Sequence, residues 1–334
     1  MQDSEPGKAL STELNRLSEI AASDSKVKFT SLAHLLTEEF LKDCYRELNH
    51  QAAAGIDRVS YATYGEDLEG NITDLVKRLR EKRYRANDIR RVWIPKPDGR
   101  QRPLGIPVLE DRVVQRGVAK ILSAIYEQDF LDVSYGFREG KSGHDALKTL
   151  ELSIMKGGVN YLIDVDIKGY FDHVDHKWLM RMMKVRIVDR TILRLIGKWL
   201  KAGVMEEGAR IRNEVGVPQG GVISPLLANI YLHYALDLWI MRNVKRELAG
   251  ARPWGRCVLR CFIIPVTIIP LFPIKVLSIP GEKFSHDGGD TLLAAFKEEM
   301  DVTVHKYLGV GGIFPVDDIF SRAAQGTGFY PGLL

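Results

Sequence analysis

The segment YLIDVDIKGYFDHVDH, residues 161–176, joins a short apolar run that carries two carboxylates to a Lys-Gly turn and two aromatic residues. Side chains of an extended segment alternate between two faces. Three branched aliphatic residues therefore share one face of the predicted strand, and Asp164 and Asp166 lie on the other. Because Lys168-Gly169 turns the chain, Asp166 is predicted at the end of the strand, where open sheets usually place their ligands. An acid that caps the turn is the alternative.

Length and composition are typical of a soluble globular protein. The 334 residues suffice for one large domain or two to three small ones, and 45% of them are hydrophobic. Three scattered cysteines do not form a disulfide framework, which predicts a reducing, cytoplasmic location. The start of the chain lacks the apolar core of a signal peptide. The segment CFIIPVTIIPLFPI, residues 261–274, is too short and too proline-rich to span a membrane, so no membrane partner is expected.

The net charge of +4 conceals an asymmetry along the chain. Residues 281–334 contain 4 Lys or Arg and 8 Asp or Glu, a net charge of −4, whereas residues 1–280 carry +8. A basic body indicates a polyanionic partner such as nucleic acid, although this charge also fits many other soluble proteins.

Residues 90–107, RRVWIPKPDGRQRPLGIP, predict a protruding basic hairpin. Pro97-Asp98-Gly99 is turn chemistry between two extended arms. Prolines in the arms cannot donate to a strand ladder, which favours an edge ribbon. Basic side chains here suit contact with phosphate, and a hairpin kept soluble by its charge is the alternative. The basic residues are Arg90, Arg91, Lys96, Arg100 and Arg102.

Apolar stripes at helical spacing predict a buried helix on each side of the hairpin. The first lies within residues 70–85, and Asn71 is its predicted N-cap. The second follows Leu109 and has acidic residues in its first turn, as the helix dipole prefers. In this second helix Arg112, Arg116 and Lys120 recur every four residues and line up as a basic stripe.

Two glycine-punctuated loops precede further predicted helices. SYGFREGKSGHDALKTL, residues 134–150, opens a helix near Ser142. GVPQGGVISPLLANIYL, residues 216–232, contains three glycines around Pro218-Gln219, where the backbone can approach a ligand closely. A tight turn with no ligand is the alternative for this second loop.

The order of these motifs resembles the reverse transcriptase of group II intron-encoded proteins, the intron reverse transcriptase and maturase family. The resemblance runs from about Ala52 to about Arg260. It implies an α+β, right-hand polymerase fold with fingers and a partial palm, followed by a divergent C-terminal tail. The implied division is an N-terminal helical extension (1–55), fingers (56–150), partial palm (151–260) and a tail of unknown fold (261–334).

The resemblance implies a Mg²⁺ site and nucleic-acid partners. Asp166 would be the first metal-binding carboxylate of the palm, and the Ile167 carbonyl would help to hold the same ion. The implied partners are intron RNA, an RNA template with a DNA primer, and deoxynucleotide triphosphates. Positioning and charge neutralisation by two Mg²⁺ ions about 3.5–4 Å apart fit the chemistry of nucleotidyl transfer.

The resemblance also implies substrate-binding residues. Lys96 and Arg102 match the finger residues that grip the incoming triphosphate. Phe171 matches the aromatic residue that stacks under the sugar and excludes a 2′-hydroxyl group. Gln219 would line the nucleotide pocket and the template.

The sequence departs from the family pattern after Arg260. The family presents a second strand with a Tyr-x-Asp-Asp turn, but residues 258–278 contain no Asp or Glu. Asp166 therefore lacks its expected partners, and Mg²⁺ should bind weakly. A change of reading frame or a rearranged copy would explain the altered tail; the nucleotide sequence around codons 255–280 tests that hypothesis.

Three interpretations follow from this departure. The chain is an intron reverse transcriptase by descent with impaired RNA-directed DNA polymerase activity. Alternatively, it is an RNA-binding, maturase-like remnant without polymerase chemistry. The third interpretation is a non-functional fragment that does not fold stably, because part of the palm sheet is absent.

Overall fold

The computed structural model describes eleven ranges of the 334 residues. The chain folds as two compact units. The first comprises Met1–Asp129 and Phe171–Tyr231, and the second comprises Phe130–Tyr170 and Leu232–Leu334. The described residues are 6–95, 101–157, 161–167, 170–206, 209–211, 216–218, 220–238, 260–265, 273–279, 300–307 and 313–315.

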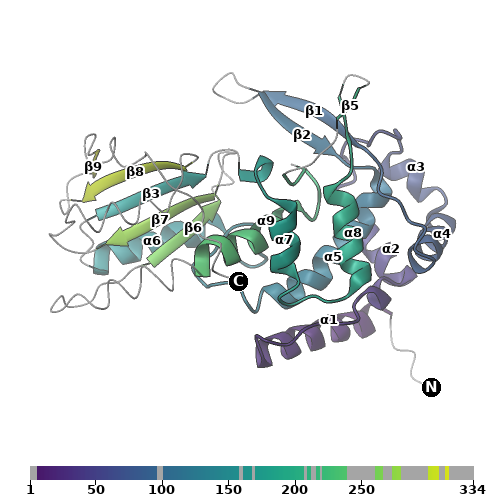
Figure 1. The fold of residues 1–334 in the computed structure, drawn as a ribbon, viewed down its shortest axis with the longest axis horizontal. Coiled ribbons are helices and arrows are strands. Elements are labelled where there is room, and N and C mark those ends of the chain that lie inside the picture. The colour runs from purple at the N-terminus through teal and green to yellow at the C-terminus, as the bar shows by residue number, and fades with distance from the viewer. Residues whose placement is uncertain are drawn as a thin grey trace. The chain divides into compact units, whose positions relative to one another are not determined.

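The first unit is mainly helical, and α5 (Leu109–Tyr126) is its central helix (Figure 1). The apolar stripe of α5 is fully buried, as its helical spacing predicts, and α1 and α2 pack against it. The N-terminal 55 residues thus belong to the same compact unit as this helix, and the four-part division of the chain stays a prediction. The other helices are α1 (Pro6–Ser23), α2 (Glu38–Arg46), α3 (Tyr61–Gly65), α4 (Leu68–Arg80), α7 (His176–Met183), α8 (Arg190–Leu200) and α9 (Ser224–Leu232), with the short helices η1 (Ala33–Leu35) and η2 (Tyr170–Asp172).

The N-terminus of α4 differs from the sequence prediction. The helix begins at Leu68, and Asp67, not Asn71, accepts a hydrogen bond from the Gly70 N–H at 3.1 Å. Asn71 lies one turn inside, where its amide donates to the Tyr64 carbonyl at 3.0 Å. Either residue type can cap a helix, so composition does not choose between them. The predicted apolar stripe is buried: Ile72, Leu75, Val76 and Leu79.

The basic hairpin is formed by β1 (Ile89–Pro95) and β2 (Gln101–Ile106), which pair antiparallel. These strands belong to a four-stranded sheet of order β2-β1-β4-β5, with β4 (Val204–Glu206) and β5 (Ala209–Ile211). β2 carries Pro103 and is an edge strand, which agrees with the predicted edge ribbon. β1 is internal, because Ile89 and Arg90 pair in parallel with β4.

The second unit contains the strand of the 161–176 segment at the centre of an antiparallel sheet. β3 (Tyr161–Ile167) lies between β7 (Pro273–Ile279) and β8 (Met300–Tyr307), in the order β6-β7-β3-β8-β9. The remaining elements are β6 (Arg260–Pro265), β9 (Ile313–Pro315), α6 (Gly143–Gly157) and a π-helical turn at His233–Asp237. The tail thus supplies four of the five described strands of this sheet, and β3 lies among them.

Within the described ranges, no helix is both long enough and apolar enough to cross a membrane.

Candidate nucleotide and nucleic-acid site

The glycine loop that contains Gln219 lies directly against the turn that contains Phe171, although about 45 residues separate them along the chain. The Val217 N–H donates to the Phe171 carbonyl at 2.7 Å, and the Gly216 N–H donates to the Val174 carbonyl at 2.9 Å. Phe171 lies in η2 and is buried, with 8% of its surface exposed. Backbone hydrogen bonds therefore bring together two motifs that are predicted to share one nucleotide site.

Gly216 permits this close approach. Its φ of 91° lies in the left-handed region, and a Cβ would stand 2.8 Å from the Asp172 carbonyl oxygen. Its own carbonyl is 2.6 Å from Nε2 of His176, the first residue of α7. His176 thus ties the loop to α7, a role that its sequence context does not predict.

The other end of the loop packs on the hairpin and on α5. A Cβ at Gly220 would stand 2.5 Å from the Gly105 carbonyl oxygen of β2, and the φ of Gly220 is 107°. The Gln115 side-chain oxygen accepts from the Val222 N–H at 3.1 Å. The Ser224 hydroxyl donates to the Pro218 carbonyl at 2.7 Å. The two residues that flank Gln219 are therefore both in contact with other parts of the fold. Gly220 lies against β2, and the Pro218 carbonyl is bound by Ser224 at the end of the same loop.

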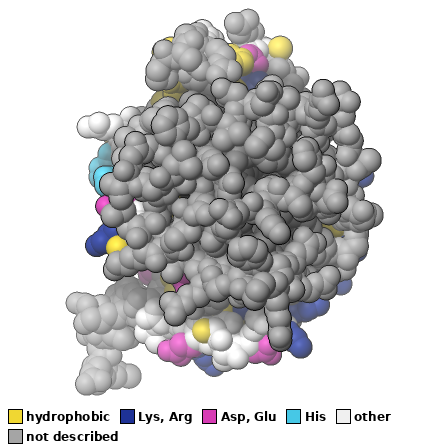
Figure 2. Space-filling view, turned by 90° about the vertical axis from the view of Figure 1, so that its left-hand side faces the viewer, with side chains coloured by type: hydrophobic (Ala, Val, Ile, Leu, Met, Phe, Trp, Pro, Cys, Tyr) yellow, Lys and Arg dark blue, Asp and Glu magenta, His cyan; other side chains and the backbone are white. Residues whose placement is uncertain are grey.

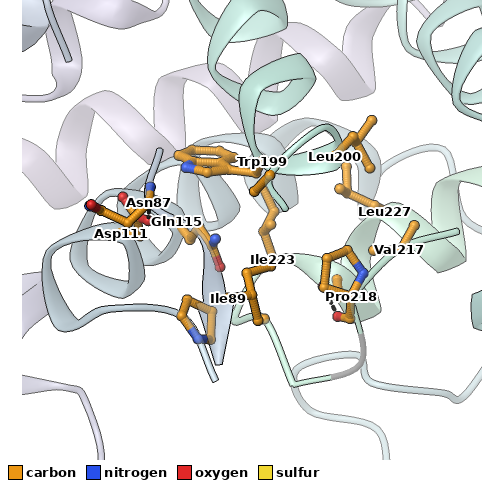
Figure 3. A pocket seen from close by; sticks show the side chains of 14 residues that line it. Asn87, Ile89, Asp111, Gln115, Trp199, Leu200, Val217, Pro218, Ile223 and Leu227 are labelled. Atoms are coloured by element: carbon orange, nitrogen blue, oxygen red, sulfur yellow. Dashed lines mark hydrogen bonds between the residues drawn. The ribbon is translucent and has the colours of Figure 1, made fainter. Parts of the chain in front are cut away.

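A pocket lies behind this loop within the first unit. Figure 3 shows Asp111 and Asn87 at one end of it and Val217, Pro218 and Leu227 at the other, with Ile223 between them. Fourteen residues line the pocket, and most of them are apolar. Asp111 and Gln115 are its polar residues from α5, and both are buried. The sequence contains a signal for both residues, because their spacing places them on the same face of α5 as its buried apolar residues.

Burial raises the pKa of the Asp111 carboxyl from 3.8 to about 6, although two hydrogen bonds oppose the rise. The donors are the Tyr84 hydroxyl and the Asn87 N–H, the latter at 2.9 Å. Tyr84 in turn accepts a hydrogen bond from the Trp199 indole N–H at 2.9 Å. Asp111 of α5 thus contacts the segment that leads into β1 and, through Tyr84, Trp199 of α8. Because its pKa is about 6, the charge of Asp111 changes between mildly acidic and neutral pH.

Asp111→Asn is expected to remove a pH dependence of stability. Because the folded-state pKa of about 6 exceeds the ordinary 3.8, the folded protein binds a proton that the unfolded chain has released. The stability that this proton confers is fully present below about pH 4 and is lost as the pH rises through about 6. Between about pH 5 and pH 8, the free energy of unfolding of the wild-type protein should fall by about 1 to 2 kcal/mol relative to that of the variant. Urea unfolding of both proteins across this interval measures the difference; parallel curves would contradict the assignment.

The structure places the other predicted residues as follows. Arg102 lies on β2 opposite Ile94 of β1. Lys96 and Gln219 lie outside the described residues. Asp166 and Ile167 belong to the second unit, where Ile167, not Asp166, is the last residue of β3.

The backbone register of the second sheet sets one acidic residue of the tail opposite Asp166. Asp166 pairs with Asp301 of β8, and Ile167 pairs with Met300. The described residues contain no group of three or more His, Cys, Asp or Glu that could hold a metal ion. A two-ion site requires several hard oxygen ligands in one place, and the backbone register brings two aspartates, Asp166 and Asp301, to neighbouring positions. Among the described residues this set is smaller than a two-ion Mg²⁺ site needs.

Many described basic side chains are engaged in ion pairs within the first unit. The Arg78 guanidinium pairs with Glu110 at 2.6 Å, and Arg116 and Lys120 of α5 both pair with Glu47, at 2.8 and 2.5 Å. Arg112, the third member of the predicted basic stripe, is buried and donates to the Ala53 carbonyl at 3.0 Å. In the view of Figure 2, Lys and Arg side chains lie near the margin and are interspersed with Asp and Glu. The basic stripe of α5 therefore attaches the N-terminal segment and is not a free cationic surface.

Comparison with known proteins identifies the family of the chain. The family model described as reverse transcriptase (RNA-dependent DNA polymerase) matches residues 94–262, half of the chain. The chain therefore belongs to the reverse transcriptase family. The match ends two residues beyond Arg260, where the sequence departs from the expected pattern.

The curated relatives that the chain resembles include a group II intron-encoded protein. Group II intron-encoded protein LtrA of Lactococcus lactis subsp. cremoris is 37% identical over 231 residues, which are 69% of this chain and 38% of that protein. Protein YkfC of Escherichia coli (strain K12) is 38% identical over 225 residues, 65% of this chain and 59% of that protein. The chain thus spans less than two thirds of the length of either relative.

Among solved structures, a chain of a partial Cas6-RT-Cas1--Cas2 complex aligns with 78% of this chain and 39% of its own length. The TM-score is 0.42 and the sequence identity is 19%.

Proposed function

We propose that this chain binds RNA as a group II intron reverse transcriptase does, and that its RNA-directed DNA polymerase step is impaired. The observation that carries the proposal is the absence of any acidic residue from positions 258–278, where the family places its second pair of aspartates. Loss of a transition-state charge clamp costs several kcal/mol, and each 1.4 kcal/mol is about tenfold in rate. One aspartate in register with Asp166 replaces that pair only in part.

The proposed roles of individual residues follow the family motifs. Lys96 and Arg102 hold a nucleoside triphosphate by charge-assisted hydrogen bonds, and Phe171 forms the wall beside its sugar. Gln219 lines the pocket and the template, supported by the hydrogen bonds that hold both ends of its loop. Asp166 and the Ile167 carbonyl would bind a single Mg²⁺ ion weakly.

Nucleotide incorporation tests the impairment. On an RNA template with an annealed DNA primer, Mg²⁺ and labelled deoxynucleotides, wild-type protein is expected to incorporate no more label than Asp166→Ala. Incorporation that depends on Asp166 would overturn the proposed impairment. If such activity is found, Asp301→Ala shows whether the tail supplies the missing carboxylate.

RNA binding is expected to persist and to weaken steeply with salt. A protein that neutralises several phosphates loses affinity linearly in the logarithm of salt concentration, by about one unit of slope per phosphate. Fluorescence anisotropy with a labelled structured RNA measures that slope, and a cooperative thermal melt of the same sample establishes that the chain is folded. Binding that is absent, or unaffected by salt, would contradict the proposed function.

A further inference from the structure

Phe137 combines two unfavourable features in one residue of the 134–150 loop. Its φ of 51° lies in the left-handed region, which bulky side chains rarely adopt. Its side chain is also 52% exposed, the largest exposure among the large hydrophobic residues for which burial is described. Backbone strain of this kind persists only when the surrounding structure imposes it, and it concentrates at functional sites.

The residue that follows Phe137, Arg138, is held by contacts with the preceding part of the chain. Arg138 is buried, with 8% of its surface exposed, and its Nη1 donates to the carbonyls of Leu131 and Ser134, each at 2.7 Å. The same guanidinium lies over the Phe130 ring, 5.3 Å from its centroid. A buried arginine thus fixes the loop immediately after Phe137 and leaves the phenyl ring exposed.

The start of α6 fixes the other end of the loop. Ser142 and Asp145 form a reciprocal cap, in which the Asp145 N–H donates to the Ser142 hydroxyl at 3.2 Å and the Ser142 N–H donates to the Asp145 carboxylate at 2.9 Å. The Lys141 ammonium donates to the Asp132 carbonyl at 2.6 Å and lies 5.2 Å from the Tyr135 ring centroid. Arg138 and Lys141 therefore bind groups of residues 130–135, next to them in the chain, and the ring of Phe137 is what this segment presents to a ligand.

We propose that Phe137 stacks on an unpaired base of bound RNA. An exposed aromatic face held on a rigid loop is the device by which proteins bind single-stranded nucleic acid, because every base has a π-face. The choice of RNA over another partner rests on the proposed function. The engagement of Arg138 and Lys141 within the loop favours contact with a base over contact with a phosphate.

Substitutions at Phe137 separate stacking from folding. Phe137→Asn removes the ring and introduces a residue that tolerates the left-handed region, so the variant is expected to melt a few degrees higher than wild type. The same variant is expected to bind a labelled 12-nucleotide single-stranded RNA about tenfold more weakly. Phe137→Tyr keeps the ring and is expected to bind within about twofold of wild type. Leu147→Gln, at a residue of α6 with 51% exposure, is the matched control and should leave binding unchanged.

A charge-matched probe identifies the group that Phe137 contacts. On an oligomer of the same length without bases, wild type and Phe137→Asn are expected to bind equally. Equal binding of both proteins to the intact RNA would overturn the inference, as would an equal loss on the abasic oligomer or a lower melting temperature for Phe137→Asn. A change of oligomeric state in Phe137→Asn without RNA would also overturn the inference, because the ring would then contact a second copy of the chain.

The same measurements separate this inference from the proposed function. If wild type itself shows no salt-sensitive RNA binding, both fail. If wild type binds RNA and Phe137→Asn binds it equally well, only this inference fails.

Discussion

Arg186→Met is expected to lower the free energy of unfolding by about 3 to 5 kcal/mol. The Arg186 side chain is 1% exposed, and its Nε lies 3.0 Å from the Asp129 carboxylate. Its terminal nitrogens donate to the carbonyls of Ala21, Asp24 and Val27, at 3.0, 2.9 and 3.1 Å. These carbonyls lie at or just beyond the end of α1, where a helix leaves acceptors without partners. The substitution therefore leaves the Asp129 carboxylate without its ion-pair partner and three buried or half-buried carbonyls without their donor.

Equilibrium unfolding in urea measures this loss. Arg194→Met, which removes an exposed arginine from α8, is the control and should change stability by no more than about 0.5 kcal/mol. Burial raises the pKa of Asp129 and Arg186 opposes that rise, so Asp129→Asn in the Arg186→Met background should recover part of the lost stability at neutral pH. A loss below about 1 kcal/mol for Arg186→Met would show that the N-terminal segment contributes little to the fold.

Arg186 also illustrates what the sequence leaves open. The apolar stripes of α4 and α5 are periodic and local, so their burial follows from spacing alone. The three carbonyls that Arg186 binds lie about 160 residues away in the sequence, and nothing in its neighbourhood distinguishes it from the exposed arginines of the same region. The same limit applies to Arg116 and Lys120, whose spacing predicted a basic stripe but which both pair with Glu47 from another segment.

The candidate site was predictable in its motifs and not in its assembly. The sequence predicted the strand of Asp166, the hairpin and the glycine loop, because each is a local pattern of turn residues and alternation. Contacts such as Gly220 on Gly105 and His176 on Gly216 join segments that no local pattern relates. Asp111 and Gln115 carried a weaker signal, as polar residues on a buried stripe, and no catalytic motif includes them.

The tail shows how the position of proline decides a strand. Three prolines in residues 261–274 are incompatible with one continuous strand through this segment. In the structure Pro265 ends β6 and Pro273 begins β7, and the two residues pair with each other at the end of the ladder. A proline at the end of a strand removes few ladder hydrogen bonds. The prolines are therefore compatible with two short strands that end and begin at them, but not with one long strand through the segment.

Gly220→Ala is expected to destabilise the protein by about 2 to 4 kcal/mol, because the change combines backbone strain with a clash. The φ of 107° favours glycine, and the added Cβ would stand 2.5 Å from the Gly105 carbonyl oxygen and 2.9 Å from Cδ1 of Leu104. The first obstacle is backbone of a paired strand, so the loop has to move away from β2 and carry Gln219 with it. Gly197→Ala in α8 is the control of opposite sign: its Cβ meets nothing within 4 Å, and replacing a helical glycine should stabilise by about 0.5 to 1 kcal/mol. Urea unfolding of both variants measures these changes in the free energy of unfolding. An unchanged value for Gly220→Ala would mean that the glycine loop does not pack on the hairpin as described.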